Sequence, residues 1–243
     1  MSDSLSALLR ECAHEIGEVV KSQRGRGLSG ERESQYFLDV AADEVALRVL
    51  GGAGLRVMSE ESGVTGNGDV TVVVDPIDGS TNCDRGIPFY ATSLAVMRGS
   101  ELIMGLVKDH STGDVFEAQK GAGATCNGLE IHSSSQTDLS KAIAAFSGLP
   151  SRHLGWAQYR ALGAASLEIC LVANGALDIY AVAQQSTLNP WDYLAGMLIA
   201  LEAGAVVQDY RDEELETSAA VVRRPVFAST KELLSTMLDE GTL

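Results

Sequence analysis

The sequence predicts a globular protein of mixed α and β structure. Hydrophobic residues make up 45% of the 243 residues and aromatic residues 5%, a composition that suits a packed α/β or α+β fold rather than a disordered chain. Apolar residues near the N-terminus recur at helical spacing, whereas residues 70–74 form a short β-branched run. No internal repeat or low-complexity linker divides the sequence, so residues 1–243 are expected to form a single domain.

Two helices are expected before the first strand. Apolar residues from Leu5 to Val20 recur every three or four positions and predict one face of an amphipathic helix. Three glycines in residues 24–30 predict a loop. A second helix is expected over residues 38–50, followed by a glycine pair that ends it.

Strands are expected in the middle of the chain. The run at residues 70–74 is long enough for a buried strand and too short for a core helix, and Pro76 should end its ladder because proline has no backbone N–H. Glycine-containing turns separate three further candidates, which predicts an antiparallel meander over residues 93–97, 102–108 and 114–118. Two later helices are expected over residues 162–174 and 191–203.

Net charge and cysteine content limit which partners and which cellular compartment are expected. The 33 acidic and 18 basic residues give a formal net charge of -15, which repels nucleic acid and anionic membranes, so neither is expected as a partner. No secretory signal or apolar span is apparent in the sequence. The isolated cysteines predict reduced thiols and a cytoplasmic protein; they are Cys12, Cys83, Cys126 and Cys170.

A turn rich in acidic residues follows the run at residues 70–74. Asp75-Pro-Ile-Asp78-Gly is a natural tight turn, which brings its two carboxylates toward one point. Two carboxylates about 4 Å apart repel by roughly 4 kcal/mol at an effective dielectric near 20, so hydrogen bonds, a proton or a cation must balance them. The alternative is that Asp75 and Asp78 cap the turn and the next helix.

Other segments could complete a metal site. Glu60 and Glu61 lie upstream, where the alternative is a solvated surface pair, and Asp192 begins an apolar helix, where the alternative is first-turn capping. Carboxylates from several segments, without His or Cys, fit Mg²⁺. After the turn, the segment Gly79-Ser80-Thr81 should present free N–H groups to a phosphate at a helix N-terminus.

With these motifs the chain resembles the inositol monophosphatase family. Its Asp-Pro-Ile-Asp-Gly-Thr and Trp-Asp-x-x-Ala-Gly signatures match residues 75–81 and 191–196, and segments 86–89, 121–128 and 170–178 follow in family order. The resemblance implies an alternating αβαβα layered sandwich, two or three Mg²⁺ ions, a small phosphate monoester as substrate, and a homodimer.

The resemblance also implies roles for matching residues. Glu60, Asp75 and the Ile77 carbonyl hold one Mg²⁺, whereas Asp75, Asp78 and Asp192 hold a second and Glu60 or Glu61 supports a third. The expected metal ligands are Glu60, Glu61, Asp75, Ile77, Asp78 and Asp192. Asp43 and the Ser80 hydroxyl orient the attacking water, so the expected catalytic residues are Asp43, Ser80 and Glu60. The expected substrate-binding residues are Gly79, Ser80, Thr81, Gly163, Ala165 and Gln185. Residues 24–33 resemble the mobile loop of the family.

Departures from the family pattern concern the substrate. The glutamate that binds the inositol ring is missing, and Val182, Gln184 or Gln185 could occupy its place in a lengthened segment. A helix is expected to be absent between residues 146 and 160. The expected function is Mg²⁺-dependent hydrolysis of a small polyol or sugar phosphate, with inositol monophosphate the best single candidate. Alternatives are phosphatases for fructose 1,6-bisphosphate, histidinol phosphate or a nucleotide 3′-phosphate, and a non-catalytic metal- or phosphate-binding regulatory protein.

Overall fold

Two helices open the structure, a computed structural model that describes residues 2–22, 27–30 and 35–239. They are α1 (Ser2–Ser22) and α2 (Phe37–Ala46), and α2 continues into a π-helical turn, η1 (Leu47–Gly51). Both expected helices are therefore confirmed. The apolar stripe of α1 is buried through Leu9, Cys12, Ala13 and Ile16. Of the expected loop, residues 24–26 and 31–33 lie outside the described residues.

The first sheet has eight strands in the order β2-β1-β3-β4-β5-β6-β7-β8. Its strands are β1 (Arg56–Ser59), β2 (Gly63–Thr65), β3 (Val70–Asp78), β4 (Ala91–Arg98), β5 (Glu101–Asp109), β6 (Val115–Gln119), β7 (Ala124–Cys126) and β8 (Leu129–Glu130). β1 pairs in parallel with β3, and β3 to β8 form a continuous antiparallel meander, which confirms the expected one. Between β3 and β4 lies the short helix α3 (Ser80–Arg85).

The expectation that Pro76 ends the ladder of β3 was wrong. The strand continues to Asp78, because the register shifts between two ladder pairs, Asp75 with Ser93 and Asp78 with Ala91. Such a bulge tolerates a proline, since its residues are released from the regular ladder bonds. Consequently the two aspartates belong to one strand and flank its bulge.

The second half of the chain supplies two central helices and a second sheet. The helices are α4 (Ala165–Ala173) and α5 (Pro190–Glu202), close to the expected bounds. The sheet has the order β10-β9-β11-β13-β12, with β9 (Ile143–Ser147), β10 (Gln158–Arg160), β11 (Ile179–Val182), β12 (Val206–Asp209) and β13 (Pro225–Ala228). A 3₁₀ turn, η2 (Leu139–Lys141), precedes it and α6 (Lys231–Asp239) follows it. Residues 148–157 contain no helix, as expected.

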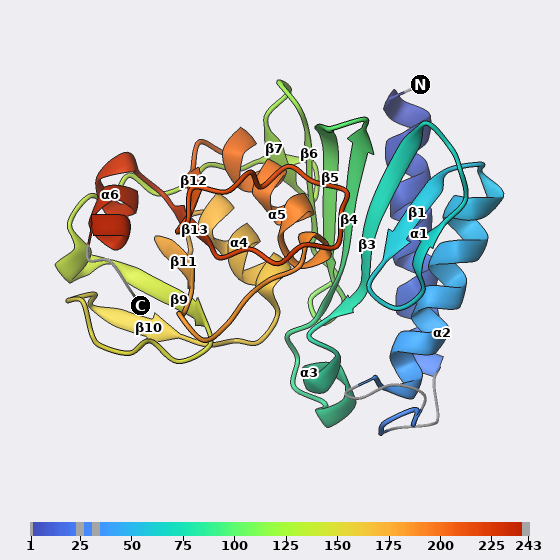
Figure 1. Cartoon of the computed structure of the whole chain (residues 1–243), viewed down its shortest axis with the longest axis horizontal. Coiled ribbons are helices and arrows are strands. Elements are labelled where there is room, and N and C mark those ends of the chain that lie inside the picture. Colours follow the sequence, from blue (N-terminus) through green and yellow to red (C-terminus); the bar gives the residue numbers. More distant parts are fainter. Residues whose placement is uncertain (1, 23–26, 31–34, 240–243) are drawn as a thin grey trace.

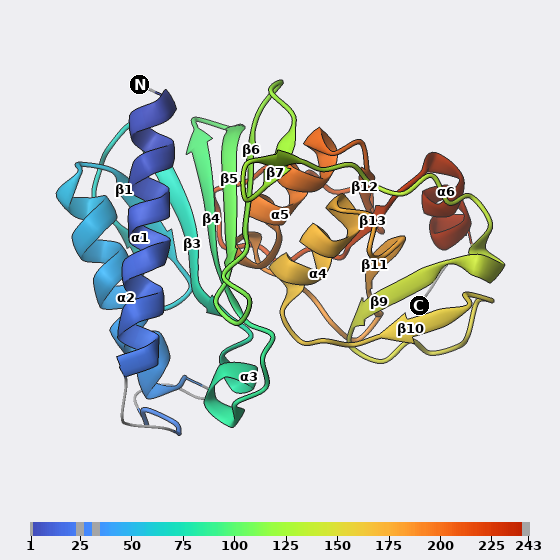
Figure 2. The same ribbon diagram turned by 180° about the vertical axis from the view of Figure 1, so that it is seen from behind.

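These elements stack as alternating layers. Figures 1 and 2 show α1 and α2 side by side on the outer face of the large sheet, α4 and α5 between the two sheets, and α6 beyond the second sheet. This is the expected αβαβα arrangement. None of the described helices combines the length and apolar character that crossing a bilayer requires.

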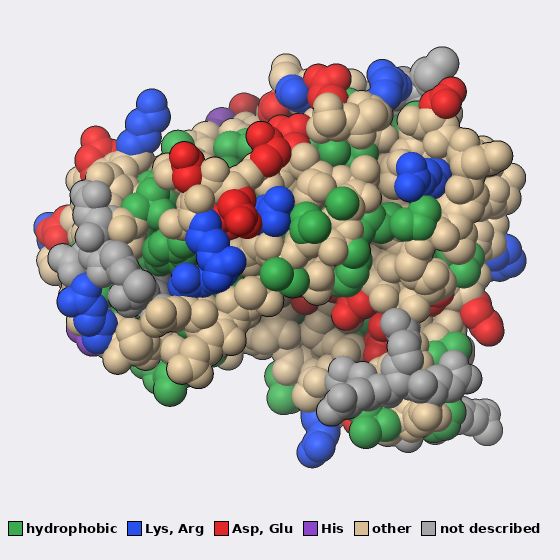
Figure 3. Space-filling model, in the orientation of Figure 1, with side chains coloured by type: hydrophobic (Ala, Val, Ile, Leu, Met, Phe, Trp, Pro, Cys, Tyr) green, Lys and Arg blue, Asp and Glu red, His purple; other side chains and the backbone are tan. Residues whose placement is uncertain are grey.

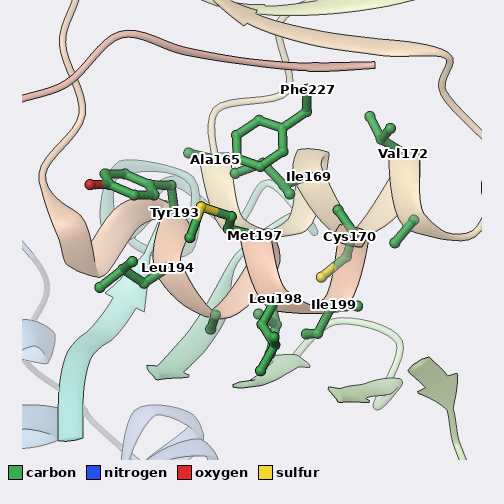
Figure 4. Packing of buried hydrophobic residues seen from close by; sticks show 14 of the residues in the cluster. Ala165, Ile169, Cys170, Val172, Tyr193, Leu194, Met197, Leu198, Ile199 and Phe227 are labelled. Atoms are coloured by element: carbon green, nitrogen blue, oxygen red, sulfur yellow. The ribbon is translucent and has the colours of Figure 1, made fainter. Parts of the chain in front are cut away.

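The central helix layer forms the largest core. In Figure 4, Met197 of α5 lies next to Ile169 of α4, with Phe227 of β13 above them, whereas Leu198 on the opposite side of α5 points toward the strands below. The layer is tightly packed, because a Cβ atom built at Gly105 of β5 would stand 2.6 Å from the Ala195 carbonyl oxygen of α5. This close contact seats α5, and with it Asp192, on the large sheet.

Candidate functional site

Three carboxylates from distant parts of the sequence meet at one point. Glu60 follows β1, Asp75 lies in β3, and Asp192 lies in the first turn of α5; one oxygen from each lies within 4.8 Å of the others. Asp75 is buried, and no donor in residues 2–22, 27–30 or 35–239 forms a hydrogen bond with its Oδ1. An unsatisfied buried carboxylate oxygen is costly unless a proton or a cation approaches it.

The pKa values of the cluster reflect this crowding. Burial, and then the charges of Glu60, Asp78 and Asp192, raise the pKa of Asp75 well above its usual range. The pKa of Glu60 rises to about 7, first through desolvation and then through Glu61 and Asp39. Glu60 as a whole residue is exposed, whereas one of its carboxylate oxygens lies with those of Asp75 and Asp192. Glu60 therefore lies at the solvent-facing rim of the cluster. The pKa of Asp192 is also raised well above its usual range, chiefly by burial.

Asp192 combines the two roles that its position suggested. It is the third residue of a capping box, in which the Asn189 backbone N–H donates to its Oδ2 at 2.6 Å. The same carboxylate contributes an oxygen to the acidic cluster. Capping of α5 therefore fixes the orientation of a cluster residue.

Asp78 is tied to the start of α4. Its carboxylate accepts hydrogen bonds from the backbone N–H groups of Ala165 (3.1 Å) and Ser166 (2.7 Å), and from the Ser166 hydroxyl. Burial raises its pKa to about 6 although these donors act in the opposite direction. Asp78 is not one of the three residues whose oxygens converge within 4.8 Å.

Two further acidic residues of the expected site, Asp43 and Glu61, lie near Glu60. Asp43 of α2 is buried and accepts hydrogen bonds from the hydroxyls of Ser59 and Ser62, which flank Glu60 and Glu61. Glu61 accepts a hydrogen bond from the side-chain amide of Gln35 and is not one of the three converging carboxylates. Ile77 is buried in the bulge of β3.

The expected phosphate-binding residues begin α3. Gly79 precedes this helix with φ of 85°, and a Cβ atom there would lie 3.0 Å from the Gly163 carbonyl oxygen, so only glycine suits this position. Ser80 is half-buried in the first turn. Thr81 is exposed, and its hydroxyl lies 3.1 Å from the hydroxyl of Tyr36.

A cavity of about 300 Å³ opens beside the cluster. Its walls include Asp78, Asp192, Gly163, Ala165, Glu168 and Tyr180. No lysine or arginine of the described residues lines it, and Figure 3 shows acidic side chains in the hollow on this face. Gln185 lies outside its walls, in an exposed turn. A larger cavity of about 540 Å³, beside Leu5 and Arg98, contains none of the expected site residues.

Sequence reasoning missed residues that hold the turn before α4, at Leu162 and Gly163. Glu168 is buried and accepts a hydrogen bond from the Leu162 N–H at 2.9 Å; burial raises its pKa to about 7. The Asn82 side chain donates to the carbonyls of Phe89 and Leu162, each at 2.8 Å. Ser166 and Glu168 carry no motif signal, because only the fold brings them near Asp78.

Comparisons with known proteins identify the family of this chain. The model of the inositol monophosphatase family matches residues 2–241. A fructose-1,6-bisphosphatase/inositol-1-monophosphatase from Thermococcus kodakarensis is 32% identical over 98% of this chain and 98% of its own length. The Nus factor SuhB of Salmonella typhimurium is 32% identical over 76% of this chain and 74% of its own. A solved structure, a hypothetical protein from Pyrococcus horikoshii with similarities to inositol-1 monophosphatase, has a TM-score of 0.83 at 28% identity, covering 98% of this chain and 96% of its own. The chain therefore belongs to the inositol monophosphatase family.

Proposed function

We propose that this chain hydrolyses a small polyol or sugar phosphate to the free alcohol and inorganic phosphate, with inositol monophosphate as the first substrate to test. Its family makes it a phosphoric monoester hydrolase. The observation that carries the proposal is the buried Asp75 carboxylate: one of its oxygens lies close to Glu60 and Asp192, and its Oδ1 accepts no hydrogen bond from the described residues. Asp192 also lines the cavity, so a cation bound at the cluster would lie next to a bound substrate.

The donor set fits Mg²⁺. Carboxylate oxygens are the ligands that hard divalent cations prefer, and burial together with neighbouring carboxylates raises the pKa values of Asp75 and Asp192, which a bound cation would offset. Glu60, Asp75 and Asp192 would hold the ions, with Asp78, Glu61 and the Ile77 carbonyl as further oxygen ligands. When bound, two or three Mg²⁺ ions would lower the pKa of water and stabilise negative charge on the phosphoryl and leaving oxygens.

The protein residues would position the reactants. Asp43 and the Ser80 hydroxyl would orient the attacking water, with Asp43 accepting a hydrogen bond from it. The backbone N–H groups of Gly79, Ser80 and Thr81 would donate to phosphate oxygens. Water adds to phosphorus while the ester P–O bond breaks, and a proton passes to the leaving alkoxide, so no covalent intermediate with the protein is required.

The cavity favours a substrate with one phosphate. A second phosphate is usually bound by Arg or Lys, which the described walls lack. Gly163 and Ala165 would contact the alcohol part of the substrate. Fructose 1,6-bisphosphate remains the alternative that the name of the Thermococcus relative supports. Histidinol phosphate and nucleotide 3′-phosphates remain further alternatives.

A second candidate function is regulatory. Similarity to a Nus factor supports a non-catalytic role in which the chain binds a metal or phosphate and acts on a partner. The combination of Asp43 with the metal-binding carboxylates favours the enzyme, because a binder has no use for a residue that orients water.

The decisive test is phosphate release from inositol, sugar, histidinol and nucleotide phosphates, with Mg²⁺ or with EDTA. The wild type should require Mg²⁺ and prefer monophosphates, and Asp75→Asn should abolish turnover. Asp69→Asn is the matched control, since Asp69 is exposed immediately before β3. Turnover that survives in Asp75→Asn would contradict the metal assignment. Metal binding without turnover of any ester would favour the regulatory candidate.

A further inference from the structure

The bulge of β3 has a single residue opposite it on β4. Asp75 pairs with Ser93 and Asp78 with Ala91, so Pro76 and Ile77 face only Thr92. Pro76 has no N–H to donate, and the regular ladder is interrupted here. A side chain must therefore replace the missing backbone bonds if this segment is to keep one conformation.

Thr92 provides that bond. Its side chain is fully buried, and its Oγ1 donates to the Pro76 carbonyl oxygen at 2.8 Å. The same Oγ1 lies 2.7 Å from Nε2 of His110, which follows β5. A hydroxyl has one hydrogen, and the carbonyl can only accept it, so Nε2 of His110 must be the donor to Thr92. The hydrogen bonds therefore run from His110 through Thr92 to Pro76.

The fold holds the His110 ring in place. Its backbone N–H donates to the Tyr90 carbonyl at 3.1 Å, and the two rings stack with centroids 6.0 Å apart. Gly17 of α1 closes the other side, because a Cβ atom there would stand 2.7 Å from Nδ1. Burial, and then the charge of Lys108, lower the pKa of His110 to about 4, so the ring is neutral near pH 7 and its single N–H lies on Nε2.

We infer that Thr92 and His110 are positioning residues of the metal site: they fix the Pro76 carbonyl, and with it the bulge that sets Asp75 and Asp78. Fixing this carbonyl fixes the plane of the peptide that joins Pro76 to Ile77, because the peptide bond is planar. The inference rests on the proposed function only in taking Asp75 and Asp78 as metal ligands. Partners that orient ligands in this way commonly change metal affinity about 10- to 100-fold when removed.

The test is direct binding of Mn²⁺ to the full chain, measured by calorimetry, together with the Mg²⁺ dependence of turnover. Thr92→Val keeps the side-chain shape and removes the hydroxyl, and it should weaken Mn²⁺ binding about 10-fold. Thr92→Ser, which keeps the hydroxyl, should bind Mn²⁺ about as tightly as the wild type. Thr71→Val is the matched control, because Thr71 is also buried but lies near the other end of β3.

A purely structural role would give a different pattern. Wild-type Mn²⁺ affinity in Thr92→Val, or weak binding that Thr92→Ser does not restore, would overturn the inference. If Thr92→Val fails to fold, His110→Gln, which keeps a side-chain N–H donor, should bind Mn²⁺ more tightly than His110→Phe, and equal affinities would overturn it. Weakened metal binding in a protein that hydrolyses no phosphate ester would support the inference and contradict the proposed function.

Discussion

The Asp75 carboxylate is buried beside three other acids, and its Oδ1 lacks a hydrogen bond within the described part of the chain. Without metal, this arrangement opposes folding. Asp75→Asn should therefore raise the free energy of unfolding in EDTA near pH 8, because the raised pKa means that the folded state disfavours the charged carboxylate. Urea denaturation measures the change. Asp69→Asn should leave it unaltered, and a destabilised Asp75→Asn would show that the charge is already balanced.

Asp43 allows chemistry to be separated from metal binding. Its carboxylate is buried against the hydroxyls of Ser59 and Ser62. If it orients the water, Asp43→Asn should lower kcat about 10²- to 10⁴-fold while the Mg²⁺ requirement changes little. Steady-state kinetics over a Mg²⁺ series measures both quantities. Ser62→Ala, which removes the more distant of the two hydroxyls, serves as the control. A shift in Mg²⁺ affinity alone would assign Asp43 to the metal site.

The family motifs indicated more of the candidate site than arguments from single residues did. The family resemblance implied that Asp75 and Asp192 share a metal site, and their carboxylates do converge. Asp78 could not be placed so simply, since its partners at the start of α4 depend on how two layers meet. Gln185 stays a prediction as a substrate-binding residue; it lies in an exposed turn of the lengthened segment.

At the scale of elements, the contact of α5 with β5 depends on a glycine. A Cβ atom at Gly105 would stand 2.6 Å from the Ala195 carbonyl oxygen, and the backbone cannot retreat without moving α5. Gly105→Ala should lower the free energy of unfolding by about 1–3 kcal/mol, the usual cost of overpacking a core. It should also weaken Mg²⁺ activation, because Asp192 moves with α5. Thermal unfolding and Mg²⁺ titration measure these effects.

A matched glycine tests whether the effect is local. Gly52 follows η1 with φ of −60°, and nothing lies within 4 Å of a Cβ atom built there. Gly52→Ala should therefore change stability by less than about 1 kcal/mol. Similar losses in both variants would indicate that the α5 contact is not the cause.

The elements themselves were unevenly predictable. The meander from β3 to β6 has strong β-branched and turn signals, so its strands were placed correctly. The family resemblance implied a second β layer, but its strands were not located in the sequence, because β9 is short and rich in alanine and pairs in parallel with distant segments, β10 and β11. Buried strands of this kind show no alternation of polar and apolar residues. The prediction for Pro76 was wrong because a β-bulge lets the strand continue past the proline.

At the scale of the whole molecule, the layers converge on a site that concentrates negative charge. The turn after β1, strand β3 of the large sheet and helix α5 of the middle layer each contribute a carboxylate. The chain already carries a formal net charge of -15, so the cluster forms against the overall field of the protein. The packing energy of the layers, rather than attraction within the site, must therefore hold these carboxylates together when metal is absent.

This balance predicts how stability depends on pH. Burial raises the pKa of Glu60 from 4.5 to about 7 and that of Asp78 from 3.8 to about 6. Between about pH 4.5 and about pH 7, the folded chain therefore binds more protons than the unfolded chain. The metal-free protein should lose stability as the pH rises through this range. Mg²⁺ replaces the protons, so it should raise Tm more at about pH 8 than at about pH 5. Calorimetric scans with Mg²⁺ or EDTA measure this difference. Asp75→Asn should reduce both the pH dependence and the Mg²⁺ effect, whereas an equal Mg²⁺ effect at the two pH values would place the bound ion outside the cluster.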